Sequence, residues 1–332
     1  MLDTLKKLSR DWFLLGMLLA VIIASFAPDI GRSGGLLHAD VLSDYGIFLI
    51  FFLHGIGLST GALLSGLSRW RLHVLVQVFT FLVFPALWWV LNLAVGRWLP
   101  QDLMFGFFYL CALPSTISSS VAMTSLARGN VPAAIFNATL STLLGIFLTP
   151  LLVSLLMGQS GQLDLAEAVL KIAKLLLLPF VIGQLLRPLW GAWFARYKKY
   201  TNVIDRAVIL LLVFSAFSDS VADGLWSKYG VGLIVQTLIG AAVILFIVLK
   251  LTKFAAQRAG FNVEDEITAV FCGSKKTLAS GVPMAKLLFG SHPAIGVIVL
   301  PIMFYHQLQL LTCAVLARKY AARSDAPAAK AN

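Results

Sequence analysis

The chain has 332 residues, of which 59% are hydrophobic and only 12% are charged, and its mean hydropathy is +0.88. A soluble domain carries about 25% charged residues, so the composition excludes an ordinary soluble enzyme and predicts a polytopic membrane protein. The net charge of +11 is spread over the ends of apolar segments. Because it forms no patch interleaved with aromatic residues, nucleic acid is not an expected partner.

Ten apolar segments are long enough to cross a bilayer, which requires about 20 residues. The first follows a basic stretch directly and is interpreted as a retained span, without a cleaved signal. The predicted spans are 12–29, 45–64, 72–96, 104–127, 131–157, 167–189, 205–222, 231–254, 264–289 and 293–317. The cysteines Cys111, Cys272 and Cys313 all lie in apolar runs, so neither a disulfide framework nor a zinc site is predicted.

Basic residues are concentrated in alternate connections between these spans. The other connections contain only Arg32, Arg97 and Lys228. Cytoplasmic loops are enriched in lysine and arginine, so both termini are predicted to be cytoplasmic, with residues 321–332 as a disordered cytoplasmic tail. Membrane lipids are the expected surroundings of the remainder.

Internal repetition divides the chain into two halves. Gln77 in "VLVQVF" matches Gln236 in "LIVQTL" at an offset of 159 residues, and the same offset places Pro114 over Gly273. Many secondary transporters consist of inverted repeats. The pattern therefore predicts an all-α fold of ten spans in two five-helix repeats, residues 1–157 and 158–320, with opposite orientations in the membrane.

Spans four and nine carry signals for an interrupted helix. Pro114 in span four is followed by hydroxyl side chains, namely Ser115, Thr116, Ser118, Ser119 and Ser120. Span nine contains Gly273, Gly281 and Pro283, together with Ser274, Thr277 and Ser280. A broken helix at membrane depth exposes partial charges that bind ions or carboxylates. The alternative is a simple proline kink whose serines bond back to carbonyl groups.

Two adjacent lysines, Lys275 and Lys276, lie near the middle of span nine, about 16 Å along a helix that starts near Glu264. Ionisable residues at this depth are candidates for function, and snorkelling from the midplane is difficult. Lys286, near the end of the span, is interpreted as a snorkelling anchor. Neighbouring helical side chains point about 100° apart, so one lysine is expected to face a polar cavity and the other to contact the carbonyls of a helix break.

Carboxylates are scarce at this depth, because the acidic residues lie at span ends or in loops and only Asp219 is placed well inside a predicted span. A buried lysine must therefore release its proton or be matched by an anionic ligand. His54, His306 and Asp219 are candidates for a proton relay, although histidines packed and hydrogen bonded for structural reasons fit the sequence equally well.

The segments "LPSTISSSVAMTSLARGN", "LLPFVIGQLLRP" and "VFCGSKKTLASG" resemble the bile acid:sodium symporter superfamily, in particular its SBF-like branch with bacterial YfeH-type proteins, over about residues 10–320. The resemblance implies a panel domain of spans one, two, six and seven and a core domain of spans three to five and eight to ten. It also implies ion sites where the broken spans four and nine cross, substrate between the two domains, and a place in the bacterial inner membrane.

The resemblance implies site residues beyond the two breaks, namely Gln77, Thr80, Asn137, Thr139 and Ser141. In the ninth span, however, Lys275 and Lys276 occupy the positions of a glutamine and an asparagine of sodium-coupled relatives. An ammonium group cannot ligate sodium, which requires oxygen ligands. No cofactor or resident metal is predicted, and these residues call sodium coupling into question. One lysine is expected to act as a fixed cation in the place of a sodium ion.

The sequence thus predicts a secondary transporter of a small or amphipathic organic anion that is either sodium-independent or coupled to protons. A non-transporting membrane regulator or scaffold with the same fold is the alternative. The sequence contains no paired nucleophile and base and no metal-binding motif of an intramembrane enzyme, so an enzyme is not predicted.

Overall fold

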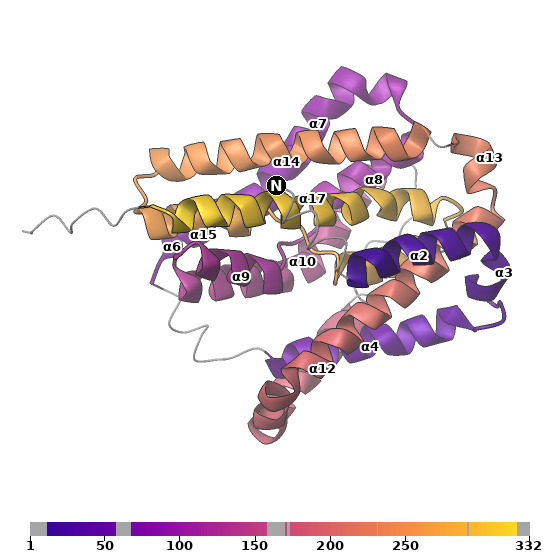
Figure 1. Cartoon of the computed structure of the whole chain (residues 1–332), viewed down its shortest axis with the longest axis horizontal. Helices are drawn as coiled ribbons and strands as arrows, with labels where there is room; N and C mark the ends of the chain where they lie inside the picture. The colour runs from indigo at the N-terminus through magenta and orange to yellow at the C-terminus, as the bar shows by residue number, and fades with distance from the viewer. Residues whose placement is uncertain are drawn as a thin grey trace, which may run out of the picture.

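The computed structural model describes residues 12–57, 68–157, 170, 173–230, 232–290 and 292–323. Within these ranges every regular element is helical (Figure 1). The elements are α2 (Trp12–Phe26), α3 (Pro28–Gly31), α4 (Ala39–Gly57), α6 (Trp70–Val78), η1 (Phe79–Val83), α7 (Phe84–Val95), η2 (Gly96–Trp98), α8 (Gln101–Ala112), α9 (Ser118–Leu126), α10 (Val131–Met157), η4 (Ala173–Leu177), α12 (Leu178–Ala222), α13 (Leu225–Tyr229), α14 (Gly232–Arg258), α15 (Val263–Gly273), α16 (Gly281–Phe289) and α17 (Ile295–Ala321).

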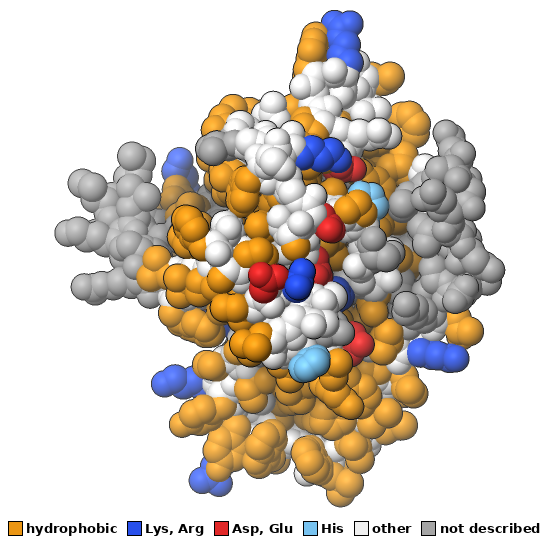
Figure 2. Space-filling model, turned by 90° about the vertical axis from the view of Figure 1, so that its right-hand side faces the viewer, with side chains coloured by type: hydrophobic (Ala, Val, Ile, Leu, Met, Phe, Trp, Pro, Cys, Tyr) orange, Lys and Arg blue, Asp and Glu red, His pale blue; other side chains and the backbone are white. Residues whose placement is uncertain are grey.

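Five stretches of helix are long and apolar enough to cross a membrane: Trp70–Trp98, Val131–Leu156, Lys174–Ala222, Gly232–Arg258 and Ile295–Ala321. Large apolar side chains cover their outer surfaces, as Leu93 and Leu185 illustrate with exposed fractions of 82% and 74%. On a water-soluble protein so much apolar surface would be unfavourable. The chain is therefore embedded in a membrane. Figure 2 shows the end near α3 and α13, where charged side chains gather in the middle of a face surrounded by hydrophobic ones.

The longest element, α12, has 45 residues, which corresponds to about 68 Å at 1.5 Å per residue. That length is more than twice the thickness of a hydrocarbon core of about 30 Å. The helix leaves helical geometry at Tyr197, where φ is −103° and ψ is 15°. This kink separates the predicted segments 167–189 and 205–222. The first residues of the former segment, the end of 45–64, the repeat boundary at 158 and the tail after 323 lie outside the described residues.

The helices form two packed groups. One group consists of α2, α3 and α4 packed against α12, seen together at the lower right of Figure 1. In the other group α14 and α17 run side by side and pack against α8, α9 and α15. The two groups meet mainly where α12 contacts α16 and α17.

The closest approach in the first group is the crossing of α4 and α12. A Cβ atom on Gly55 would overlap the carbonyl oxygen of Phe180, and one on Gly183 would overlap the carbonyl oxygen of Phe52. Gln184 adds a hydrogen bond of 2.7 Å from its side-chain amide to the carbonyl of Gly55. Only glycine permits two backbones to approach this closely, so the crossing joins α4 and α12 tightly.

We expect Gly183→Ala to destabilise the protein by roughly 1–3 kcal/mol, because the added methyl group pushes two backbones apart in a packed crossing. Thermal unfolding of the purified protein in detergent measures the change. Gly232→Ala is the matched control, because no atom lies within 4 Å of its Cβ position. Equal melting temperatures for the two variants would contradict the tight crossing.

Candidate functional site

Two helices are interrupted in the middle of the molecule. The chain leaves helical structure after Ala112 and resumes it at Ser118, with Pro114 in between. It leaves again after Gly273 and resumes at Gly281. Pro283 lies in the first turn of α16 and so follows the second break. Each interruption exposes the ends of two short helices at membrane depth.

The two interrupted segments bind each other directly. The backbone amide of Thr277 donates to the carbonyl of Pro114 at 3.1 Å. The hydroxyl of Ser115 donates to the carbonyl of Cys272 at 2.6 Å, and that of Ser120 donates to the carbonyl of Phe271 at 3.1 Å. The serines that follow Pro114 therefore satisfy carbonyl groups at the end of α15. This is one way in which a broken helix can persist inside a membrane.

Lys276 occupies the centre of this crossing, and its exposed fraction is 0%. Its Nζ donates three hydrogen bonds, to the carbonyls of Thr80 at 2.8 Å, Cys111 at 2.8 Å and Leu113 at 2.6 Å. An ammonium group has three donors, so all of them are satisfied. The ring centre of Phe84 lies 4.0 Å from Nζ and adds a cation–π contact.

The three carbonyls are free to accept because of local backbone geometry. Cys111 and Leu113 stand at the carboxyl end of α8, where the last carbonyls of a helix lack partners within it. The partial negative charge at that end also favours a cation. Thr80 belongs to η1, a π-helical turn in span three. Such a turn shifts the backbone ladder by one residue and leaves a carbonyl without its usual amide partner.

Lys275 is equally buried but has a different environment. Its Nζ donates to the carbonyl of Ser119 at 2.7 Å and lies 5.5 Å from the ring centre of Phe271. The hydroxyl oxygen of Ser119 is itself buried without a hydrogen-bond partner among the described residues. The two lysines therefore point to separate places, as their adjacent positions predict, and Lys276 contacts the helix-break carbonyls. Neither side chain is exposed in a cavity in this structure.

Side chains of helix α17 hydrogen bond to the backbone of the second helix break. The side-chain oxygen of Gln309 accepts from the backbone amide of Lys276 at 2.9 Å, and its side-chain nitrogen donates to the carbonyl of Lys276 at 2.8 Å. The hydroxyl of Tyr305 donates to the carbonyl of Ser274 at 2.6 Å. From α8, Tyr109 donates to the carbonyl of Gly281 at 2.5 Å. These contacts fix the segment that carries both lysines.

The remaining predicted site residues carry hydroxyl or amide side chains, and most of them hydrogen bond to neighbouring residues. Ser141 accepts from the backbone amide of Ser115 at 2.9 Å, and Gln77 donates to the carbonyl of Asn137 at 3.1 Å. The hydroxyls of Thr80 and Ser274 bond back to their own helices, and Ser280 contacts Thr277. Thr116 and Thr139 are buried, and Ser118 is exposed at the start of α9.

The predicted proton-relay residues do not lie together. His54 of α4 pairs with Asp205 of α12 at 3.3 Å, within the first helix group. Asp219 accepts from the backbone and hydroxyl of Ser33 and pairs with Lys286 at 3.5 Å. The snorkelling interpretation of Lys286 was therefore wrong: its side chain is only 12% exposed and pairs with a carboxylate. His306 alone approaches the lysine segment, because its Nδ1 lies 3.1 Å from the side-chain nitrogen of Gln309.

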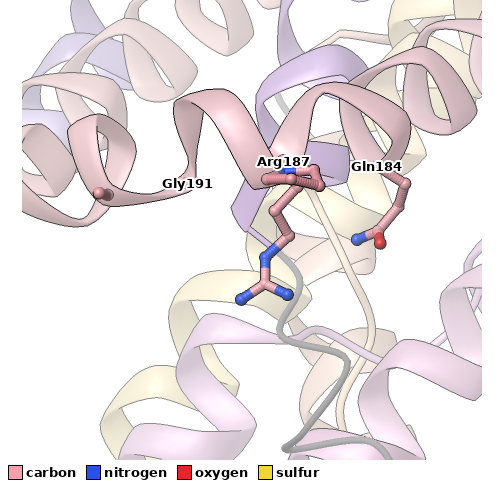
Figure 3. A pocket seen from close by; sticks show the side chains of 5 residues that line it. Gln184, Arg187 and Gly191 are labelled. Carbon is pink, nitrogen blue, oxygen red and sulfur yellow. The ribbon is translucent and has the colours of Figure 1, made fainter.

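A cavity of about 350 Å³ lies beside α12, lined by Gln184, Arg187, Pro188, Gly191 and Ala192. Figure 3 shows the side chains of Gln184 and Arg187 extending from the same stretch of this helix. The predicted motif "LLPFVIGQLLRP" thus supplies a cationic side chain to a cavity. A metal site is not seen, because no cluster of three or more ligating side chains occurs among the described residues.

Comparison with known proteins identifies the family. Residues 11–322 match the model of the SBF-like CPA transporter family. The chain belongs to this family. It is 48% identical to the Pseudomonas aeruginosa protein PA2026, covering 96% of this chain and 95% of that protein. It is 45% identical to YfeH of Escherichia coli over 95% and 94% of the two chains. Sodium/bile acid cotransporter 7 of Mus musculus is 31% identical over 94% and 93%. This SBF-like protein is accordingly a member of a transporter family and not an enzyme.

The different environments of the two lysines predict that replacing Lys276 destabilises this SBF-like protein more than replacing Lys275. Lys276→Met leaves three buried carbonyls without their donor, whereas Lys275→Met leaves one. An unsatisfied buried polar group costs about 1–3 kcal/mol. We therefore expect a clearly larger fall in melting temperature for Lys276→Met, measured by thermal unfolding in detergent. A larger fall for Lys275→Met would contradict the assignment of Lys276 as the main structural cation.

Proposed function

We propose that the protein is a secondary transporter that carries a small or amphipathic organic anion across the bacterial inner membrane by alternating access. The observation that carries the proposal is the ammonium of Lys276, held by three carbonyls at the crossing of two broken helices. Interrupted helices that meet near the midplane are the usual sites of ions and substrates in secondary transporters. In this proposal Lys276 is a fixed cation in the place where relatives hold a sodium ion.

The arrangement of helices supports two moving bodies. The panel would comprise spans one, two, six and seven, which correspond to α2, α4 and the two parts of α12. The core would comprise spans three to five and eight to ten around the broken pairs α8–α9 and α15–α16. Each broken pair is followed by a helix of 27 residues, α10 and α17, which fits two inverted five-helix repeats. The distribution of basic residues favours cytoplasmic termini.

Charge favours an anionic substrate. Lys275 and Lys276 are buried, and no carboxylate lies within salt-bridge distance of either among the described residues. Lys276 is satisfied by carbonyl groups. Among the described residues, however, Lys275 makes one hydrogen bond, and the nearby hydroxyl of Ser119 has no partner. An anion that reached this place would meet an ammonium in a region of low dielectric constant, where the attraction is strong.

The same geometry bears on the coupling ion. Sodium requires oxygen ligands, and the Lys276 ammonium already occupies the carbonyls that could supply them. We therefore propose transport that does not depend on sodium and that is either coupled to protons or passive.

The first test is uptake into proteoliposomes. A thermal-shift screen of purified protein against carboxylates and sulfonates, including amphipathic ones, selects a labelled anion. We expect saturable uptake that an inward sodium gradient does not accelerate, compared in parallel with a proton gradient and with no gradient. Strictly sodium-dependent uptake that survives Lys275→Gln and Lys276→Gln would overturn the proposal. Absence of saturable uptake for every anion that shifts the melting temperature would favour a membrane regulator or scaffold instead.

The second test asks whether a sodium ion can replace the ammonium. In Lys276→Gln the carbonyls of Thr80, Cys111 and Leu113 lose their cation, and we expect added sodium to raise the melting temperature of this variant but not of the wild type. A ligand present at 100 times its dissociation constant stabilises by about 2.7 kcal/mol. N-methylglucamine controls for ionic strength, and Lys286→Gln is the control for loss of a lysine elsewhere. Equal sodium effects on wild type and Lys276→Gln would refute the replacement.

Alternating access also requires contacts that close one side of the molecule. Lys286 of α16 pairs with Asp219 of α12 and contacts Ser33, in the loop after α3. The backbone amide of Gly296, at the start of α17, donates to Ser220 of α12 at 2.7 Å. Both contacts join the proposed core to the proposed panel at the end of the molecule seen in Figure 2. They must break when that end opens.

We expect Asp219→Asn to favour opening at that end by about 1.5–3 kcal/mol, because hydrogen bonds to a charged group contribute about this much. Spin labels at Leu36→Cys and Trp98→Cys, which are 82% and 61% exposed, report the separation by electron–electron resonance. The population with the longer separation should increase in Asp219→Asn. Lys228→Gln is the control, since it removes the exposed pair of Lys228 with Asp102. No difference from this control would show that the Asp219 contact does not hold the end closed.

A further inference from the structure

The side-chain amide of Gln309 has only one chemically acceptable orientation. Its two ends face the backbone amide and the carbonyl of the same residue, Lys276, at 2.9 and 2.8 Å. Reversing the amide would place its oxygen against the Lys276 carbonyl and its nitrogen against the Lys276 amide, which costs two hydrogen bonds and creates two repulsive contacts. The amide nitrogen of Gln309 is therefore located by chemistry, although the two ends of an amide are otherwise hard to distinguish.

The same nitrogen lies 3.1 Å from Nδ1 of His306, one helical turn earlier in α17. The amide nitrogen can only donate, so Nδ1 must accept. An imidazole nitrogen accepts only when it carries no proton. His306 is therefore neutral here, with its proton on Nε2. A second proton, on Nδ1, would abolish this hydrogen bond and place an N–H group against an N–H group.

We propose that His306 and Gln309 are positioning residues that couple proton binding to the lysine segment. When His306 is neutral, Gln309 holds the backbone of Lys276 in place. When His306 binds a proton at Nδ1, the repulsion from Gln309 weakens both contacts with Lys276 and frees the segment to move. Coupling of this kind is reciprocal, so movement of the Lys276 segment also changes the affinity of His306 for a proton. This inference rests on the proposed function and assigns its coupling step to the contact between His306 and Gln309.

His306 lies at the contact between α17 and α2. Its ring stands edge-on to that of Phe13 in α2, with centroids 6.4 Å apart, and the next residue, Gln307, contacts the sulfur of Met17 at 4.0 Å. Helix α2 belongs to the proposed panel and α17 to the proposed core. Relative motion of these bodies would change the hydration of His306, and burial disfavours the charged form of histidine.

The charged groups around this contact are few among the described residues. Residues 12–26 of α2 contain no ionisable side chain. Helix α12 contributes Arg206, whose guanidinium lies 5.5 Å from the ring centre of Phe13, next to Asp205, which pairs with His54. From the core side, Lys276 lies beyond Gln309, whose side chain contacts its backbone.

Nuclear magnetic resonance of histidine ring nitrogens tests the tautomer without reference to transport. Full-length protein with nitrogen-15-labelled histidine is placed in lipid nanodiscs, and the His306 signal is assigned by its loss in His306→Asn. We expect the wild type near neutral pH to carry the proton on Nε2. Gln309→Leu removes the donor, so the fraction protonated on Nδ1 should rise, whereas Gln307→Leu should leave the tautomer unchanged. A wild-type signal from the Nδ1–H tautomer or from the doubly protonated ring would overturn the proposal.

Uptake at different pH values tests the coupling. His306→Asn offers an amide oxygen in place of Nδ1 that can accept from Gln309 but cannot gain a proton. We expect this variant to keep its melting temperature, to show at every pH the low uptake that the wild type shows when His306 is neutral, and so to lose the pH dependence between about pH 5 and about pH 8, where histidine titrates. His306→Leu has no acceptor and should lower the melting temperature as well, and Gln307→Leu should keep the wild-type profile. An unchanged pH profile in His306→Asn would overturn the coupling. Absence of uptake in the wild type would instead refute the proposed function and leave the tautomer result standing.

Discussion

The ammonium of Lys276 and its three carbonyl acceptors form the interaction on which the centre of the molecule depends. A broken helix in a membrane has backbone groups without partners, and water is not available there to satisfy them. The carboxyl end of α8 and the π-helical turn η1 both present such carbonyls to one point. A single side chain with three donors satisfies them all. The break between α8 and α9, the π-helical turn η1 and the lysine that follows α15 therefore explain one another.

Lys275 differs because it leaves part of its bonding capacity unused. The two residues are adjacent, equally buried and identical in chemistry, yet among the described residues one has a complete set of acceptors and the other a single carbonyl. A lysine with acceptors for all of its donors stabilises the fold, because any movement of its side chain costs hydrogen bonds. An incomplete set in a buried place tends to be completed by something else. Structural and ligand-binding roles can thus be divided between neighbours in one segment.

The sequence predicted the membrane location and the family, and it missed the detailed contacts around the lysines for physical reasons. Composition and apolar runs indicated the membrane, and the quoted motifs indicated the family, because both depend on local residue types. The angle between neighbouring helical side chains predicted that one of the two lysines would contact helix-break carbonyls, but only the structure shows that it is Lys276. The identity of the carbonyls did not follow, since any residue supplies a carbonyl and Thr80 and Cys111 carry no signal of that role. Lys286 was misinterpreted because its partner, Asp219, is 67 residues away in sequence and only the packing of α12 on α16 brings them together.

Gln309 illustrates the same limit. One glutamine in an apolar span predicts little, and its two contacts with Lys276 depend on the exact rotation of α17.

A cation that is covalently attached has an energetic consequence that a bound sodium ion lacks. A sodium ion enters the cell with its substrate and contributes its own charge to the transfer, whereas a lysine returns with the protein in every cycle and contributes none. The charge moved per cycle would then be that of the substrate and of any proton alone. Moving one negative charge inward against an interior-negative potential costs about 2.3 kcal/mol per 100 mV. In the proposed transport, with Lys276 in place of sodium, the membrane potential would oppose the import of an unaccompanied anion and would assist its export.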